Sequence, residues 1–169
     1  EVVDPSGNVV FQGELVNGVP NGKGKMLSPE GLPVAEGQFV NGVLNGPGKI
    51  YHPNGKLKYE GGFLNGEFDG SGKLYNEQDQ LIYVGAFVNS AFNGKGKQYH
   101  PNQKIAYEGE FLNGGYNGQG KLFDPNGEPV YEGGFAMGLY NGAGKEFHPG
   151  KVLKFEGGSA NGRYTGPGK

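Results

Sequence analysis

Apolar and polar residues alternate along short segments of this chain, and Tyr107–Leu112 shows the pattern most clearly. A tyrosine, a glycine and a phenylalanine alternate there with two glutamates and a leucine. Because successive side chains of a strand point to opposite faces, this period of two predicts a β-strand with a ring face and an acidic face. Gly120–Phe123 predicts a short returning strand, and Asn113-Gly114 and Asn117-Gly118 are predicted to bracket the bend between the strands. Pro125–Gly127 predicts a closing turn.

The same phrase recurs with a period of 24 residues along the whole chain. Repeats begin near residues 11, 35, 59, 83, 107, 131 and 155, after a partial entry unit at 1–10, so that residues 1–169 form a single array. The marker glycines are Gly13, Gly37, Gly61, Gly85, Gly109, Gly133 and Gly157. A fixed period of this length is typical of solenoids, in which each unit buries its apolar face on its neighbours.

These patterns predict an all-β fold, an elongated single-layer antiparallel β-meander or solenoid of stacked β-hairpins. No segment has helical spacing, and a glycine or proline every few residues would break a helix. The glycines have a predicted packing role. Gly109 lies between Tyr107 and Phe111 on one face, which leaves room for a ring of the neighbouring strand to lie over bare backbone.

Composition removes several classes of function. The 169 residues include 15 Lys and Arg against 17 Asp and Glu, and a net charge of -2 argues against a nucleic-acid partner. Cysteine is absent, which excludes disulfides and thiolate zinc sites and leaves the compartment open. No apolar run reaches the roughly 18 residues of a membrane helix, so the segment is expected to be soluble. Because it begins at Glu1 in mid-repeat, we expect an excised segment whose full-length protein can carry a leader or an anchor to a membrane or cell surface.

Three stretches carry a resemblance to a known family. They are YEGGFLNG at Tyr59–Gly66, YEGEFLNG at Tyr107–Gly114 and YEGGF at Tyr131–Phe135, each followed by G-x-G. This phrase resembles the MORN (membrane occupation and recognition nexus) repeat, and it covers essentially the whole chain. The period is one residue longer than the family's usual unit, and phenylalanine stands where tryptophan is common, as in a bacterial-type variant. The resemblance implies a twisted hairpin sheet with an aromatic groove and a non-enzymatic role in scaffolding, dimerisation, peptide binding or phospholipid contact.

Aromatic residues are the first candidate site. Those in the bends can fold back over the groove or stand out as contacts for a partner. Repeats 11 and 35 have Pro20 and Leu44 at the bend position. The predicted groove residues are Tyr59, Phe63, Tyr83, Phe87, Tyr107, Phe111, Tyr131 and Phe135, with Phe68, Phe92, Tyr116 and Tyr140 in the bends.

A recurring lysine is the second candidate. It is found at Lys25, Lys49, Lys73, Lys97, Lys121, Lys145 and Lys169, of which Lys73, Lys97, Lys121 and Lys145 are the candidate anion contacts. The row can serve phosphate headgroups or an acidic peptide, or its members can pair with the recurring glutamates. Because carboxylates are as numerous as lysines, pairing is the favoured interpretation. The glutamates are Glu36, Glu60, Glu108, Glu132 and Glu156.

Nothing in the sequence indicates catalysis or a cofactor. The glutamates recur in five of seven repeats, whereas a catalytic pair is a local exception. His52, His100 and His148 are spaced 48 residues apart, or ~19 Å in the predicted sheet, too far apart to share a metal ion at ~2 Å, and are predicted to be turn residues. The sequence therefore predicts a module that binds another protein or peptide, self-association included. The alternatives are an anionic phospholipid surface and, less favoured, an antitoxin-like role.

Overall fold

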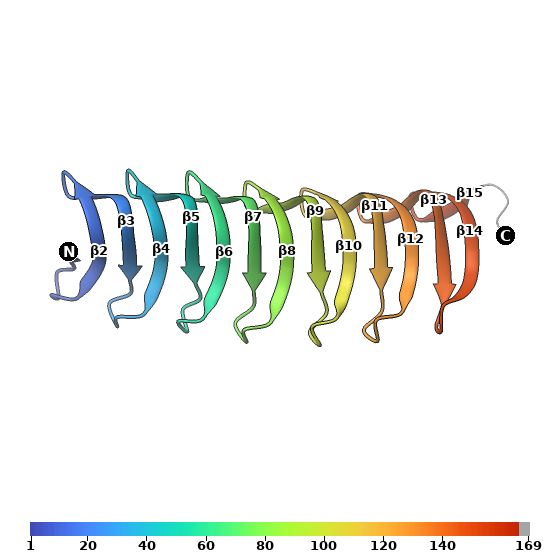
Figure 1. Ribbon diagram of the computed structural model, residues 1–169, viewed down its shortest axis with the longest axis horizontal. Helices are drawn as coiled ribbons and strands as arrows, with labels where there is room; N and C mark the ends of the chain where they lie inside the picture. Colours follow the sequence, from blue (N-terminus) through green and yellow to red (C-terminus); the bar gives the residue numbers. More distant parts are fainter. Residues whose placement is uncertain (166–169) are drawn as a thin grey trace. The chain divides into compact units, whose positions relative to one another are not determined.

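The computed structural model describes residues 1–165 and confirms the all-β fold. Neighbouring strands are antiparallel and follow one another in the sheet in chain order, as in a single-layer meander (Figure 1). No helix occurs in the described part of the chain. The strands are β1 (Val2–Val3), β2 (Val9–Val16), β3 (Val19–Leu27), β4 (Pro33–Val40), β5 (Val43–Tyr51), β6 (Leu57–Leu64), β7 (Glu67–Tyr75), β8 (Leu81–Val88), β9 (Ala91–Tyr99), β10 (Ile105–Leu112), β11 (Gly115–Phe123), β12 (Pro129–Ala136), β13 (Leu139–His148), β14 (Val152–Ala160) and β15 (Arg163–Thr165).

The chain divides into two compact parts, which we describe separately. The N-terminal part comprises Glu1–Leu81 and Phe87–Ser90, and the C-terminal part comprises Ile82–Ala86 and Ala91–Lys169. Lys169, the last member of the predicted lysine row, lies outside the described residues.

Each repeat contributes two strands joined by a tight turn, as predicted. In β10 and β11 this turn is Asn113-Gly114, whose φ angles of 48° and 87° are both positive, as a two-residue hairpin turn of type I′ requires. The amide of Gly114 donates a hydrogen bond of 2.9 Å to the carbonyl of Phe92 in the preceding repeat. Turns of this kind therefore tie each repeat to the one before it through backbone alone.

The second asparagine-glycine pair does not turn the chain, which corrects the predicted bend. Asn117-Gly118 lies inside β11, a strand that starts at Gly115 instead of Gly120. Gly109 faces Gly120 while Phe111 faces Tyr116, so three residues of β11 oppose one residue of β10. This is a bulge, and Gly118 adopts a φ of 86° within it. An asparagine-glycine pair tolerates positive φ in a turn and in a bulge alike, so the local sequence does not distinguish them.

The glycines allow close approach, but not in the predicted way. A Cβ on Gly109 would lie 2.5 Å from the Cα of Gly120, which means that two backbones meet there. A Cβ on Gly120 would lie 2.2 Å from Oη and 2.5 Å from Cζ of Tyr107. The ring therefore covers the glycine of the returning strand, and Gly109 provides room for backbone instead of a ring.

The opposite edge of each part, formed by the longer turns, has a period of two repeats. In the N-terminal part, Nε2 of His52 lies 2.9 Å from the carbonyl oxygen of Tyr75, and Nδ2 of Asn54 donates to that of Glu77 at 3.0 Å. The same two contacts join His100 and Asn102 to the carbonyls of Phe123 and Pro125 in the C-terminal part. Every second turn thus clamps the next one with side chains, and this explains the 48-residue spacing of the histidines.

Candidate functional site

The predicted groove rings of the opening strands form the core of the sheet. Their side chains are between 0% and 4% exposed, and they meet one another edge to face at about 5 Å. We call them the inner rings: Tyr59, Phe63, Tyr83, Phe87, Tyr107, Phe111, Tyr131 and Phe135. Such contacts suit the ring quadrupole and add to the burial of apolar area. The inner rings therefore stabilise the fold and leave no open groove between them.

The rings predicted in the bends lie in strands and stack on the inner tyrosines. We call them the outer rings: Phe68, Phe92, Tyr116 and Tyr140. The ring centroids are 3.8 Å apart for Tyr59 with Phe68 and for Tyr83 with Phe92, 3.9 Å for Tyr107 with Tyr116, and 3.7 Å for Tyr131 with Tyr140. The bulge makes this possible, because it lets the start of each returning strand approach the inner tyrosine. The outer rings are half-buried, as expected for rings that fold back.

The inner tyrosine hydroxyls are held within their own strands. Oη of Tyr107 donates a 2.8 Å hydrogen bond to the carbonyl of Glu110, and Tyr59, Tyr83 and Tyr131 do the same three residues on. Burial raises the pKa of Tyr59, Tyr83 and Tyr107 to about 12, because the phenolate would lose its hydration. These hydroxyls are thus neutral structural donors at physiological pH.

The other face of the sheet carries the lysines and glutamates. In the C-terminal part they face one another strand by strand in the order Lys97, Glu108, Lys121, Glu132, Lys145 and Glu156, which we call the charge ladder. Ion pairs of 3.5 Å join Lys97 to Glu108 and Lys145 to Glu156. In the N-terminal part, Lys25 pairs with Glu36 at 3.7 Å and Lys49 with Glu60 at 3.6 Å. These pairs match the favoured interpretation of the lysine row, although the ladder leaves some members outside any pair.

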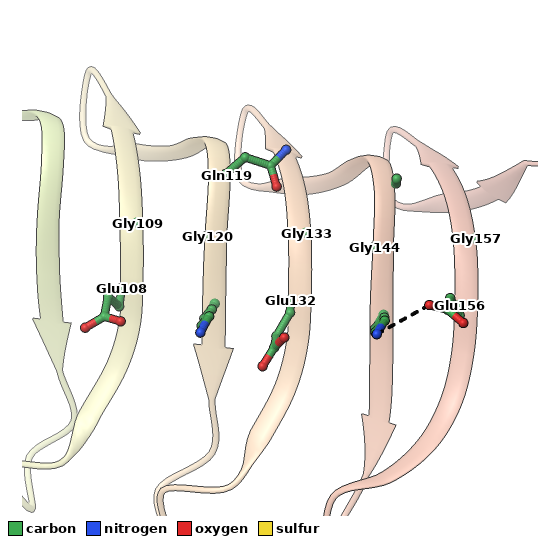
Figure 2. Close-up of a pocket in the computed structure, with 12 residues that line it drawn as sticks. Glu108, Gly109, Gln119, Gly120, Glu132, Gly133, Gly144, Glu156 and Gly157 are labelled. Atoms are coloured by element: carbon green, nitrogen blue, oxygen red, sulfur yellow. Dashed lines mark ion pairs between the residues drawn. The ribbon is translucent and has the colours of Figure 1, made fainter.

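A groove that the sequence analysis missed runs beside the charge ladder. It has a volume of about 640 Å³, and Figure 2 shows it across β10 to β14. Gly109, Gly120, Gly133 and Gly144 line it together with Gln119 and ladder residues. The facing glycines leave a strip without side chains between two rows of polar residues. The available signal was the pairing of G-x-G glycines across strands, as in Gly109 with Gly120.

Comparison with protein families decides the identity of these repeats. The MORN repeat matches residues 11–32, 59–77, 107–128 and 131–150, and the MORN repeat variant matches residues 44–65 and 92–113. Together the matches cover more than half of the chain.

The chain belongs to the MORN repeat family.

The two kinds of MORN match reflect the two-repeat period seen in the turns. The variant matches begin at residues 44 and 92, again 48 residues apart, and each starts at a returning strand, β5 or β9. No curated protein matched this MORN repeat chain. MORN repeats are non-catalytic modules generally associated with protein or membrane binding, which fits a binding module.

The MORN structure gives no sign of a metal centre within residues 1–165. No group of three or more potential ligands among histidine, aspartate, glutamate and cysteine comes together there. His52 and His100 lie in turns as predicted, whereas His148 is the last residue of β13. Among the same residues, no helix is long and apolar enough to cross a membrane.

Proposed function

We propose that this chain is a non-enzymatic binding module that recognises another protein or a peptide through its outer rings. The observation that carries the proposal is the stacking of Phe68, Phe92, Tyr116 and Tyr140 on inner tyrosines at 3.7 to 3.9 Å. Each outer ring is half-buried, so part of it remains accessible to a partner.

The stacking makes the outer rings suitable for binding. A ring held in place before a partner arrives loses little conformational freedom on binding, and immobilising a free side chain costs about 0.5 to 1.5 kcal/mol. Aromatic side chains are also enriched in the buried centres of protein interfaces. A repeating row of such rings fits a partner that extends along several repeats.

The charge ladder is less suited to the alternative of an anionic membrane surface. Attraction to such a surface grows with clustered cations, by about 1 kcal/mol for each lysine or arginine near it. Here each ladder lysine faces glutamate on both neighbouring strands, as Lys121 does with Glu108 and Glu132. The net charge of -2 adds no attraction.

The experiment compares the outer rings with the ladder lysines. The ring variant carries Phe92→Leu, Tyr116→Leu and Tyr140→Leu, because Leu44 already occupies the equivalent position in β5 and is only 5% exposed there. The control variant carries Lys97→Gln and Lys121→Gln on the opposite face. Each protein is used for affinity capture from cells with quantitative mass spectrometry, and for flotation with vesicles of phosphatidylserine and phosphatidylcholine.

We expect a protein captured by the parent chain and by the lysine variant to be lost with the ring variant. Circular dichroism confirms that both variants are folded. Capture that survives in the ring variant contradicts the proposal. Vesicle binding that disappears in the lysine variant and at high salt, without any captured protein, would establish the lipid alternative instead.

A further inference from the structure

We propose that the C-terminal part forms a two-fold symmetric dimer in which the charge ladders of two copies face each other. The interaction surface is the face opposite to the outer rings, so this inference does not depend on the proposed function. It rests on the order of the ladder charges and on two of them that lack a partner within the chain.

The order of charges in the C-terminal ladder is self-complementary. From β9 to β14 it alternates between lysine and glutamate and contains six residues, an even number. A two-fold axis that reverses the ladder therefore places lysine against glutamate at every position. Lys97 faces the second copy's Glu156, Glu108 faces its Lys145, and the two central residues face each other. A C2 interface uses the same patch on both subunits and requires this kind of self-complementarity.

The two central charges are the ones that the described residues leave unpaired. Lys121 and Glu132 are directly opposite each other on β11 and β12, yet neither has an ion pair within 4.0 Å in the described part of the chain. The residues on either side form closed pairs, of which Figure 2 draws Lys145 with Glu156. A dimer with its axis between Lys121 and Glu132 gives each of them a partner on the second copy.

Sheet geometry concentrates the interaction at this centre. Adjacent strands are rotated by roughly 20 to 25° in a fixed hand, so two ladders placed face to face diverge with distance from the axis. The outer pairs are already closed, with side chains between 39% and 52% exposed, and they gain little from a second copy. Lys121 and Glu132 therefore determine whether the dimer forms, and its stability depends on salt.

The ladder of the N-terminal part provides an internal control. It contains Lys25, Glu36, Lys49, Glu60 and Lys73, an odd number of charges. Reversing it about its centre places lysine against lysine at three positions. The N-terminal ladder is therefore not self-complementary in register, and substitutions there should leave the dimer unchanged.

The test is sedimentation velocity of the chain at low and high salt, with charge-reversal variants. Lys121→Glu places carboxylate against carboxylate at two symmetric positions, and Glu132→Lys places ammonium against ammonium. We expect a dimer at low salt for the parent chain and at least about tenfold weaker association for either variant. Mixing the two variants restores attraction at both central contacts, so the mixture should form a heterodimer. The matched control, Lys73→Glu, should dimerise like the parent.

Every outcome bears on the proposal. A parent chain that stays monomeric at low salt overturns it, and so does a dimer that resists both charge reversals. A mixture that remains monomeric would also overturn it, provided that each variant is folded by circular dichroism. The leucine variant of the outer rings should still dimerise. Loss of protein capture and loss of dimerisation thus report on different faces of the sheet.

Discussion

The repeats that begin at Ala35 and Tyr107 share a backbone but fill it differently. Gly37 faces Gly48 and Phe39 faces Leu44, in the same register as Gly109 with Gly120 and Phe111 with Tyr116. Yet the first repeat buries only an alanine and a leucine where the second stacks two tyrosine rings. The bulge and the paired glycines therefore do not require the ring stack.

The comparison also shows that the inner and outer positions vary together. Where the inner residue is Tyr59, Tyr83, Tyr107 or Tyr131, the outer residue is a ring, and where it is Ala35 the outer residue is Leu44. A tyrosine without a stacking partner would expose its face, and a ring without tyrosine beneath it would leave a void. The two positions form one packing unit.

The largest expected difference between these repeats concerns their second glycine. Gly120→Ala would place a methyl group 2.2 Å from Oη of Tyr107, whereas Gly48→Ala would meet the Leu44 side chain at 3.3 Å and the Glu36 carbonyl at 2.9 Å. Overpacking a core typically costs 1 to 3 kcal/mol. We expect a loss of about 3 kcal/mol for Gly120→Ala and about 1 kcal/mol for Gly48→Ala. Urea unfolding followed by circular dichroism measures both, and equal losses would show that the ring does not restrict Gly120.

The inner hydroxyl predicts a smaller difference that depends on pH. Tyr107→Phe removes the hydrogen bond to the Glu110 carbonyl, and we expect a loss of about 1 kcal/mol at neutral pH. Burial raises the pKa of Tyr107 from 10.0 to about 12, so the folded state favours the neutral phenol. This contribution is fully present below pH 10 and is lost as the pH rises through about 12.

The pH dependence can be measured with Tyr83→Phe, Tyr107→Phe and Tyr131→Phe combined. The parent chain should lose stability steeply in alkaline urea titrations, and the triple variant should lose it less steeply. Ala35 offers no hydroxyl at the same position in the N-terminal part. Parallel curves for parent and variant would show that these phenols titrate freely in the folded protein.

The smallest effect should be the same in both repeats. Lys49 pairs with Glu60 at 3.6 Å and Lys97 with Glu108 at 3.5 Å, and all four side chains are substantially exposed. Exposed pairs contribute about 0.2 to 1 kcal/mol, so Lys49→Gln and Lys97→Gln should each change the unfolding free energy by about 0.5 kcal/mol or less. Thermal unfolding at low salt can resolve whether either pair exceeds that limit.

The repeat period and the alternation of residues were enough to predict the fold class. They gave the strand pair, the turn at Asn113-Gly114 and the opposite faces of rings and charges, because these depend only on local pattern. The extent of β11 could not be predicted, since Asn117-Gly118 has the same residues as the turn before it. Which pair turns the chain depends on the register with β10 and β12, a non-local property.

The candidate site was harder to predict than the fold. A single layer suggested that Tyr107 and Phe111 would form an open groove, but the bulge brings Tyr116 over Tyr107 and closes it. The position of the bare strip required the pairing of Gly109 with Gly120, which no single strand reveals. Residue types along one strand therefore predicted which face is apolar, and not how much of that face remains accessible.

The alternating turn clamps define how such an array can grow or shrink. His52 reaches forward to Tyr75 and His100 to Phe123, so a turn that gives and a turn that receives follow each other in strict succession. Excising 24 residues would bring two givers or two receivers together, whereas excising 48 would preserve the succession. The block that duplication, deletion or engineering can handle cleanly in this chain is thus a couple of repeats.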